Sequence, residues 1–115
     1  MDWKDFLRDT NRELAALRPA MPEAAAGFAA LAKGATADGA LARKTKELIA
    51  LAIGIATHCD ACIGFHVRAA IRLGATREEV AETIATCVYM GGGPALMYGA
   101  RALDCYDRLS EAAKG

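Results

Sequence analysis

The sequence has no excess of charge and no long apolar run. Its 14 Lys and Arg residues balance 14 Asp and Glu residues, so there is no basic stripe to neutralise phosphates. Nucleic-acid binding and attachment to an anionic membrane surface therefore have no support. The longest strongly apolar run covers 48–56, whereas a membrane span needs about 20 residues. We predict neither a nucleic-acid partner nor a membrane partner.

The first residues, 1–5, carry charges and lead into an amphipathic pattern. A secretory signal peptide needs a basic start followed by an apolar run, and this pattern offers neither. We therefore expect a cytoplasmic protein. In a reducing cytosol, the four cysteines are not expected to form a structural disulfide framework, and a close pair indicates redox or metal chemistry instead.

Proline is scarce, and no strand pattern is present. Each of the three Pro residues flanks a helical pattern. Just over half of the residues are hydrophobic, and Ala, which loses no side-chain entropy in a helix, is very frequent. A chain of 115 residues corresponds to one domain with a modest core. We expect a single all-α domain over 1–115, a bundle of about six helices around an antiparallel helical hairpin at 41–73.

Start and stop signals predict where the helices lie. The first helix should end before Pro19, because the residue before a proline disfavours helical geometry. Pro22 suits the first turn of the second helix, and Gly34 suits its C-terminal cap. Gly74 should stop the fourth helix, and Thr76 opens the fifth with capping-box spacing. The expected helices cover about 3–17, 22–34, 41–57 and 59–73, then 76 up to a glycine hinge at 91–93, and a sixth segment beyond it.

The fourth helix is expected to begin with the pair Cys59 and Cys62. A helix N-terminus carries partial positive charge and free N–H groups, so it favours an anion such as a thiolate. A cysteine at such a position can have a lowered pKa, and the thiolate is its reactive form. Because three-residue spacing lets the two sulfur atoms meet across one turn, the pair predicts a redox-active dithiol.

Glu47 and His66 are expected to assist this dithiol. Cys59, Cys62 and His66 share one helix face, which we expect to point inward. If the chain reverses near 57–59, Glu47 and His66 lie at roughly 15 and 12 Å from the turn, at the helical rise of about 1.5 Å per residue. Glu47 can then orient and charge-stabilise His66, which can pass a proton to or from a thiol.

Structural and metal-binding interpretations of these residues remain open. The two close cysteines could be core residues of a structural, oligomeric module. With His58 and His66 they could form a zinc site, since thiolates and imidazoles suit zinc, although one continuous helix rarely wraps four ligands tetrahedrally. His66 alone could be a satisfied core histidine, and Glu47 alone a solvated helix residue. Cys87 and Cys105 have no nearby partner in the sequence and are expected to be small apolar fillers.

The residues 47–52 (Glu-Leu-Ile-Ala-Leu-Ala), the motif 58–62 (His-Cys-Asp-Ala-Cys) and His66 together resemble a known family. This is the alkylhydroperoxidase D-like branch of the carboxymuconolactone decarboxylase family. The pairs 74–75 and 78–79 and the run 91–95 also resemble that branch, so the likeness covers about 40–104. The spacing of Glu, Cys-x-x-Cys and His is the specific part of the resemblance.

The resemblance implies a dithiol hydroperoxidase or disulfide reductase with a proton relay from Glu47 through His66 to Cys59 and Cys62. It also implies that Cys62 attacks the peroxide and Cys59 resolves, whereas in dithiol chemistry generally the first cysteine attacks more often. The sulfenic acid left on one cysteine would be captured by the other, and an external dithiol, either a lipoyl group or a thioredoxin-like protein, would restore the pair. No cofactor is required. Since the decarboxylase branch lacks this dithiol, decarboxylation of a small lactone is a weaker alternative.

A homo-oligomer is expected from the third helix. The run 48–56 is apolar all round, which is typical of a helix buried on every side, in a core or between subunits. The family resemblance implies trimers or hexamers, and we expect the dithiol to lie near a subunit boundary. The N-terminal helix, with Trp3, Phe6 and Leu7, is a second candidate contact surface.

Overall fold

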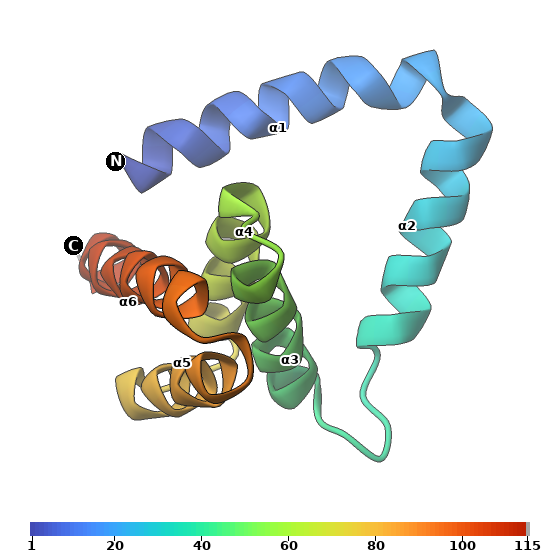
Figure 1. Cartoon of the computed structure of the whole chain (residues 1–115). Helices are drawn as coiled ribbons and strands as arrows, with labels where there is room; N and C mark the ends of the chain where they lie inside the picture. The colour runs from blue at the N-terminus through green and yellow to red at the C-terminus, as the bar shows by residue number, and fades with distance from the viewer. Residues whose placement is uncertain (115) are drawn as a thin grey trace.

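The computed structural model describes residues 1–114, and within them it has six α-helices and no strand (Figure 1). The predicted all-α fold with six helices is confirmed. No helix in the described range is long and apolar enough to cross a membrane. In chain order the helices are α1 (Trp3–Ala20), α2 (Pro22–Thr36), α3 (Arg43–Ala56), α4 (Asp60–Arg72), α5 (Arg77–Gly91) and α6 (Gly93–Lys114).

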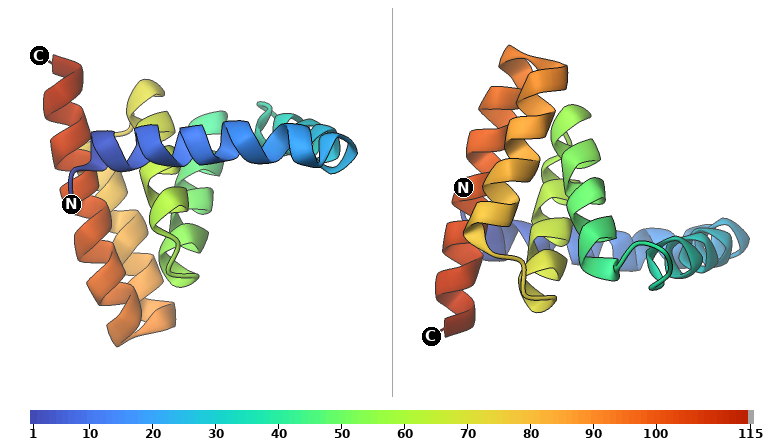
Figure 2. Two further views of the ribbon diagram at one scale, coloured as in Figure 1. Left: turned by 90° about the horizontal axis from the view of Figure 1, so that it is seen from above. Right: turned by 90° about the horizontal axis from the view of Figure 1, so that it is seen from below.

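Helices α3 to α6 form a bundle of two helical hairpins. Helix α3 lies beside α4, and α5 lies beside α6 (Figure 2). Because α3 also packs against α5, and α4 against α6, the two hairpins enclose one core. The predicted hairpin at the centre of the fold is therefore present. The fully buried side chains of this core include Leu51, Ile55, Ile63, Val67, Val80, Ala102 and Cys105.

Helix α1 is attached to the bundle through its first turns. Trp3 and Leu7 are buried, and the Trp3 indole N–H donates to Asp104 of α6 at 3.3 Å. Leu7 sits on Gly64 of α4, where an added Cβ would lie 2.6 Å from Leu7 Cδ2. No residue of 11–36 is buried, and Figure 1 shows this segment standing away from the bundle before the chain returns to α3. We call residues 11–36 the arm.

The turn between α4 and α5 follows its sequence signals. Gly74 has a φ of +84°, a conformation that glycine adopts without strain, and it ends α4 as predicted. Thr76 and Glu79 form the predicted capping box, in which each side chain accepts the backbone N–H of the other, at 3.1 and 2.8 Å. Glu79 also pairs with Lys44 of α3 at 2.9 Å, so the turn is tied to the first hairpin.

Two predicted helix ends are wrong. Helix α1 includes Pro19 in its last turn and runs to Ala20. The proline removes the hydrogen bond to the Ala15 carbonyl oxygen, but Ala15 is exposed, so water can take the place of the missing N–H. Helix α2 continues through Gly34 to Thr36, whose hydroxyl donates to the Ala32 carbonyl oxygen at 2.8 Å. The loop before α3 therefore begins later than predicted.

The burial expected for two apolar segments also differs. Within one chain, the neighbours of α3 in the bundle cover only one of its sides and leave Ile49 and Ile53 exposed. Burial of the other side between subunits stays a prediction. Trp3 and Leu7, which were expected at a subunit contact, are instead buried inside their own chain. The apolar surfaces that one chain leaves open therefore include the outer side of α3, the arm, and the junction of α5 with α6, where Tyr89 and Met90 are exposed.

Candidate active site

The Cys59–Cys62 pair lies at the start of α4, where the sequence predicts it. Cys59 is the N-cap residue, and its Sγ accepts the backbone N–H of Cys62 at 3.1 Å. The two residues are joined as a disulfide, with Cα atoms 5.2 Å apart. This separation is within the usual range for disulfides, so the bond needs no backbone rearrangement.

The start of α4 favours negative charge on this pair. The first N–H groups of a helix have no intrahelical acceptor, and the helix dipole places its positive end there. The Cys62 N–H already points at Cys59 Sγ. After reduction of the disulfide, the same N–H is placed to donate to a Cys59 thiolate. Helix α3 approaches closely behind the pair, because an added Cβ at Gly54 would lie 3.0 Å from Cys62 Cβ.

The structure brings Glu47 of α3 and His66 of α4 together. Glu47 Oε2 lies 2.7 Å from His66 Nδ1, at the matched depth in the hairpin that the sequence predicts. Glu47 is 4 % exposed, whereas the His66 side chain is 33 % exposed. An ionised carboxylate only accepts hydrogen bonds, so a neutral His66 carries its proton on Nδ1 and leaves Nε2 free to accept another. His66 lies one helical turn beyond Cys62.

The face of α4 that points into the core differs from the predicted one. Ile63, Val67 and Ala70 are buried, whereas Cys62 and His66 are half-buried. The buried stripe of α4 is thus displaced by one residue position, about 100° around the helix axis, from the stripe that contains the dithiol. Cys62 and His66 therefore lie at the edge of the core, where solvent and a small substrate can reach them.

Side chains of α6 contact His58 and Asp60, the residues on both sides of Cys59. The Tyr98 ring stacks on His58 with centroids 4.6 Å apart and planes inclined by 15°. Arg101 Nη1 donates to both carboxylate oxygens of Asp60, at 2.9 and 2.8 Å, and this pairing raises the pKa of Arg101. His58 has a φ of +57°, in the left-handed region that His populates more often than most residues. The start of α4 is thereby fixed against α6.

Sequence reasoning missed Tyr98 and Arg101. They lie on a helix far along the chain, and Arg101 is 41 residues from Asp60. Neither residue is part of a motif, since an exposed arginine one turn from a tyrosine is common on helix surfaces. Only the packing of α6 against α4 brings them to the dithiol.

The other two cysteines are free and buried, as expected for fillers. Cys87 Sγ donates to the Ala52 carbonyl oxygen at 3.3 Å, and burial raises the pKa of its thiol. Burial, with a contribution from Asp104, raises the pKa of Cys105 to about 12. Neither thiol is significantly ionised at neutral pH, so neither has the thiolate character that redox chemistry needs.

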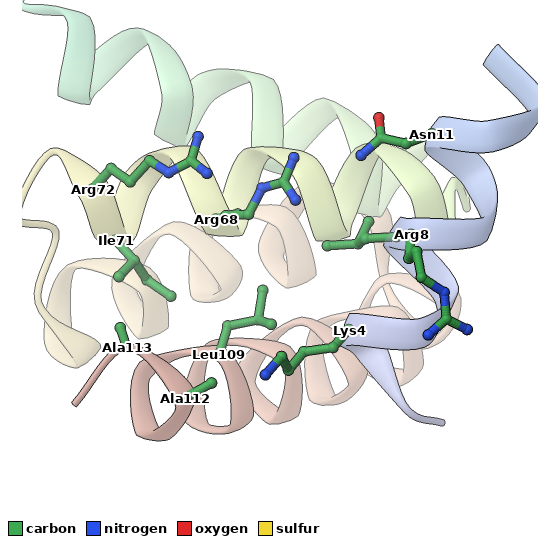
Figure 3. A pocket seen from close by; sticks show the side chains of 10 residues that line it. Lys4, Arg8, Asn11, Arg68, Ile71, Arg72, Leu109, Ala112 and Ala113 are labelled. Carbon is green, nitrogen blue, oxygen red and sulfur yellow. The ribbon is translucent and has the colours of Figure 1, made fainter. Parts of the chain in front are cut away.

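Two hollows lie beside α4. One of about 580 Å³ opens next to Glu47 and His66, and its remaining walls come from Arg43 and the end of the arm, including Lys33 and Thr36. The other, of about 540 Å³, is a groove between α1, α4 and α6 with a cationic rim (Figure 3). Its lining contains no cysteine, histidine or carboxylate, so it is separate from the dithiol. It is formed by Lys4, Leu7, Arg8, Asn11, Arg68, Ile71, Arg72, Leu109, Ala112 and Ala113.

The zinc arrangement considered from the sequence is not present in the described residues. Within 1–114, no three His, Cys, Asp or Glu side chains are grouped to hold a metal ion. The His58 ring lies against Tyr98, and His66 is bonded to Glu47.

Residues 22–104 match the sequence model of the carboxymuconolactone decarboxylase family. The chain belongs to this family. The match begins well before residue 40, where the resemblance noted from the sequence begins, so it includes α2 and thus much of the arm. The family pattern therefore covers the arm as well as the bundle that contains the dithiol.

Relatives of similar length match almost the whole chain, two of them in structure and one in sequence. A family protein from Legionella pneumophila is 50 % identical, with a TM-score of 0.91 over 94 % of this chain and 96 % of its own. One from Thermotoga maritima is 28 % identical, with a TM-score of 0.84 over 94 % and 92 %, and its name gives an antioxidative response as a possible role. An uncharacterised protein of Cupriavidus necator is 44 % identical over 95 % of this chain and 96 % of its own.

Proposed function

We propose that the protein is a thiol-dependent peroxidase or disulfide reductase that works through Cys59 and Cys62, with Glu47 and His66 as a proton relay. One observation carries this proposal: a disulfide-forming pair lies at a helix N-terminus, one turn from a histidine bonded to a buried carboxylate. The possible antioxidative role of the Thermotoga relative supports the same chemistry.

In the proposed reaction, His66 Nε2 first takes the proton of the attacking thiol, while Glu47 stabilises the imidazolium. The thiolate attacks the terminal oxygen of the hydroperoxide and breaks the O–O bond. The sulfur becomes a sulfenic acid, and the leaving alkoxide takes the proton back from His66. The second thiol then attacks the sulfenic sulfur, so that water leaves and a disulfide forms. The substrate is reduced to an alcohol, and the dithiol is oxidised.

The order of attack can be assigned with two single variants. The family resemblance implies that Cys62 attacks, whereas the Cys62 N–H bonded to Cys59 Sγ favours a thiolate on Cys59. In Cys59→Ser and in Cys62→Ser, a sulfenic acid can form but cannot be resolved. Trapping with dimedone after one equivalent of peroxide, followed by mass spectrometry, identifies the attacking cysteine as the one that is modified in the faster variant.

The proposal includes an electron donor and an assembly. The disulfide must be reduced by thiol exchange with an external dithiol, for which lipoyl groups or thioredoxin-like proteins are suitable, and no cofactor is needed. We place the reaction in the cytoplasm, where such donors are kept reduced. The proposed assembly is a homotrimer or a hexamer.

Peptide mapping tests the proposed function directly. Reduced protein treated with one equivalent of hydroperoxide should contain a single intramolecular disulfide between Cys59 and Cys62, and Cys87→Ala should behave in the same way. Dihydrolipoamide or reduced thioredoxin should then support repeated turnover. The proposal is wrong if both thiols stay free, or if the peroxide-induced disulfide involves Cys87 or Cys105.

A further inference from the structure

The Asp60 carboxylate stands next to the dithiol, and α6 neutralises it. Asp60 follows Cys59 directly and lies in the first turn of α4, with its side chain 27 % exposed. A bare carboxylate at this place opposes ionisation of the neighbouring thiols, because like charges disfavour each other. Arg101 Nη1 lies within 2.9 Å of both Asp60 oxygens and is anchored over the Tyr98 ring, with its guanidinium carbon 5.0 Å from the ring centroid.

We propose that Arg101 is a positioning residue that holds Asp60 and cancels its charge, and so keeps the Cys59–Cys62 dithiol able to ionise near neutral pH. The inference rests on the proposed function only in taking these two cysteines as a reversible dithiol. It assigns to α6 an electrostatic part in a site whose other members all come from the α3–α4 hairpin.

Among the charged groups around the dithiol, Arg101 is the cation that neutralises Asp60. Helix α5 makes no contact with α4 in the described residues, and α1 meets α4 through the apolar contact of Leu7 with Gly64. The cations Lys4 and Arg8 of α1 lie at the separate groove, beside Arg68 and Arg72. The titratable or charged groups that face the start of α4 are therefore His58, Asp60 and His66 on its own segment, Glu47 on α3, and Tyr98 and Arg101 on α6.

A pair of opposite charges gives the proposal a distinctive sign pattern. Arg101→Gln leaves the Asp60 carboxylate bare, so the pKa of the dithiol should rise. Asp60→Asn leaves the Arg101 cation unpaired, so the pKa should fall. In the double variant both charges are gone, and the pKa should return close to that of the unmodified protein. Loosening of the structure would instead move both single variants in the same direction.

The test is a titration of the reduced, full-length protein, following thiolate absorbance and the rate of alkylation of Cys59 and Cys62 against pH. Because the ion pair is partly exposed to solvent, each single variant should shift the dithiol pKa by about 0.5–1 unit at low salt, and less at about 1 M salt. The matched control is Arg77→Gln. Arg77 also joins α6 to the start of another helix, at 2.8 Å from Asp107, without touching the dithiol.

Three outcomes would overturn the inference: a shift for Arg101→Gln no larger than that for Arg77→Gln, shifts of the same sign in both single variants, or a double variant that does not return toward the unmodified value. Circular dichroism and urea unfolding verify that each variant is folded. The titration uses no peroxide, so its result does not depend on whether the dithiol reduces a hydroperoxide. Protein that titrates as expected but consumes no peroxide would contradict the proposed function alone.

Discussion

The bundle and the arm are both helical, but different forces hold them. In the bundle, α3 to α6 bury apolar side chains against one another, and two interhelical ion pairs, Lys44–Glu79 and Asp60–Arg101, join the hairpins. The arm buries no residue, although α2 alone has 15 residues. Isolated helices of up to about 12–15 residues are marginal in water even when they are rich in alanine. Packing around one core therefore holds the bundle together, with Trp3 and Leu7 of α1 contributing to that core, whereas the arm has no such packing within its own chain.

The arm also carries apolar side chains that its own chain leaves open. Phe28 is 72 % exposed and Leu31 is 66 % exposed, on one face of α2. Other exposed apolar side chains lie on the outer side of α3, at Ile49 and Ile53, and at the end of α5 and the start of α6, at Tyr89, Met90, Leu96 and Met97. In the proposed homo-oligomer, the arm of one subunit packs on another subunit. We therefore propose that the bundle carries the chemistry and that the arm takes part in the assembly.

The largest expected effect concerns the bundle. Glu47→Gln and His66→Gln remove the proton relay but keep similar shapes, so peroxide turnover should fall by about 10²–10⁴-fold while the fold is kept. Steady-state peroxide consumption with a competent dithiol donor measures this effect. Glu78→Gln, at an exposed carboxylate on α5, is the control and should keep its rate. Rates equal to that of the unmodified protein in both relay variants would mean that Glu47 and His66 have no part in proton transfer.

The second effect concerns the arm. Phe28→Asp combined with Leu31→Asp should dissociate the oligomer, because the variant places two charges on a surface that is apolar and covered in the assembly. Sedimentation or light scattering at micromolar concentration measures the mass, and peptide mapping should still find the Cys59–Cys62 disulfide. Ala26→Asp, about 160° from Phe28 and 140° from Leu31 around the α2 axis, is the control. If the unmodified protein is already a monomer, or if the double variant keeps its mass, the arm is not the contact.

The two regions also differ in how well the sequence predicts them. The contact between Glu47 and His66 follows from counting residues on each side of a turn, since the rise of a helix is constant. The capping box at Thr76 and the stop at Gly74 are equally local. These features depend on backbone geometry within one hairpin or one turn, which a single sequence contains.

Features that depend on distant packing could not be predicted in this way. Apolar spacing shows that α2 has an apolar face but not whether its own chain covers that face. The buried stripe of α4, with Ile63 and Val67, is set by the approach of α1, α3 and α6 together. Arg101 reaches Asp60 only because α6 crosses the start of α4.

A smaller effect is expected where α1 leaves the bundle. Gly64→Ala would place a Cβ 2.6 Å from Leu7 Cδ2 and 3.2 Å from Leu7 Cγ, so Leu7 must move. Overpacking of this kind costs about 1–3 kcal/mol, which urea unfolding followed by Trp3 fluorescence can measure. In the Leu7→Ala background the crowding is gone, so the same substitution should cost less there. Strictly additive costs would show that the two residues are not in contact.

The smallest effect tests whether the arm and the bundle unfold separately. Gly27 lies inside α2, and an added Cβ would meet nothing within 4 Å, so Gly27→Ala should favour the helix by about 0.5–1 kcal/mol. In the Phe28→Asp, Leu31→Asp background, where no second subunit covers the arm, this gain should stay local. Amide exchange in α2 should slow by about two- to fivefold, while urea unfolding of the bundle stays unchanged. If the free energy of bundle unfolding rises by the same amount, the arm and the bundle unfold as one unit, and the division between them is wrong.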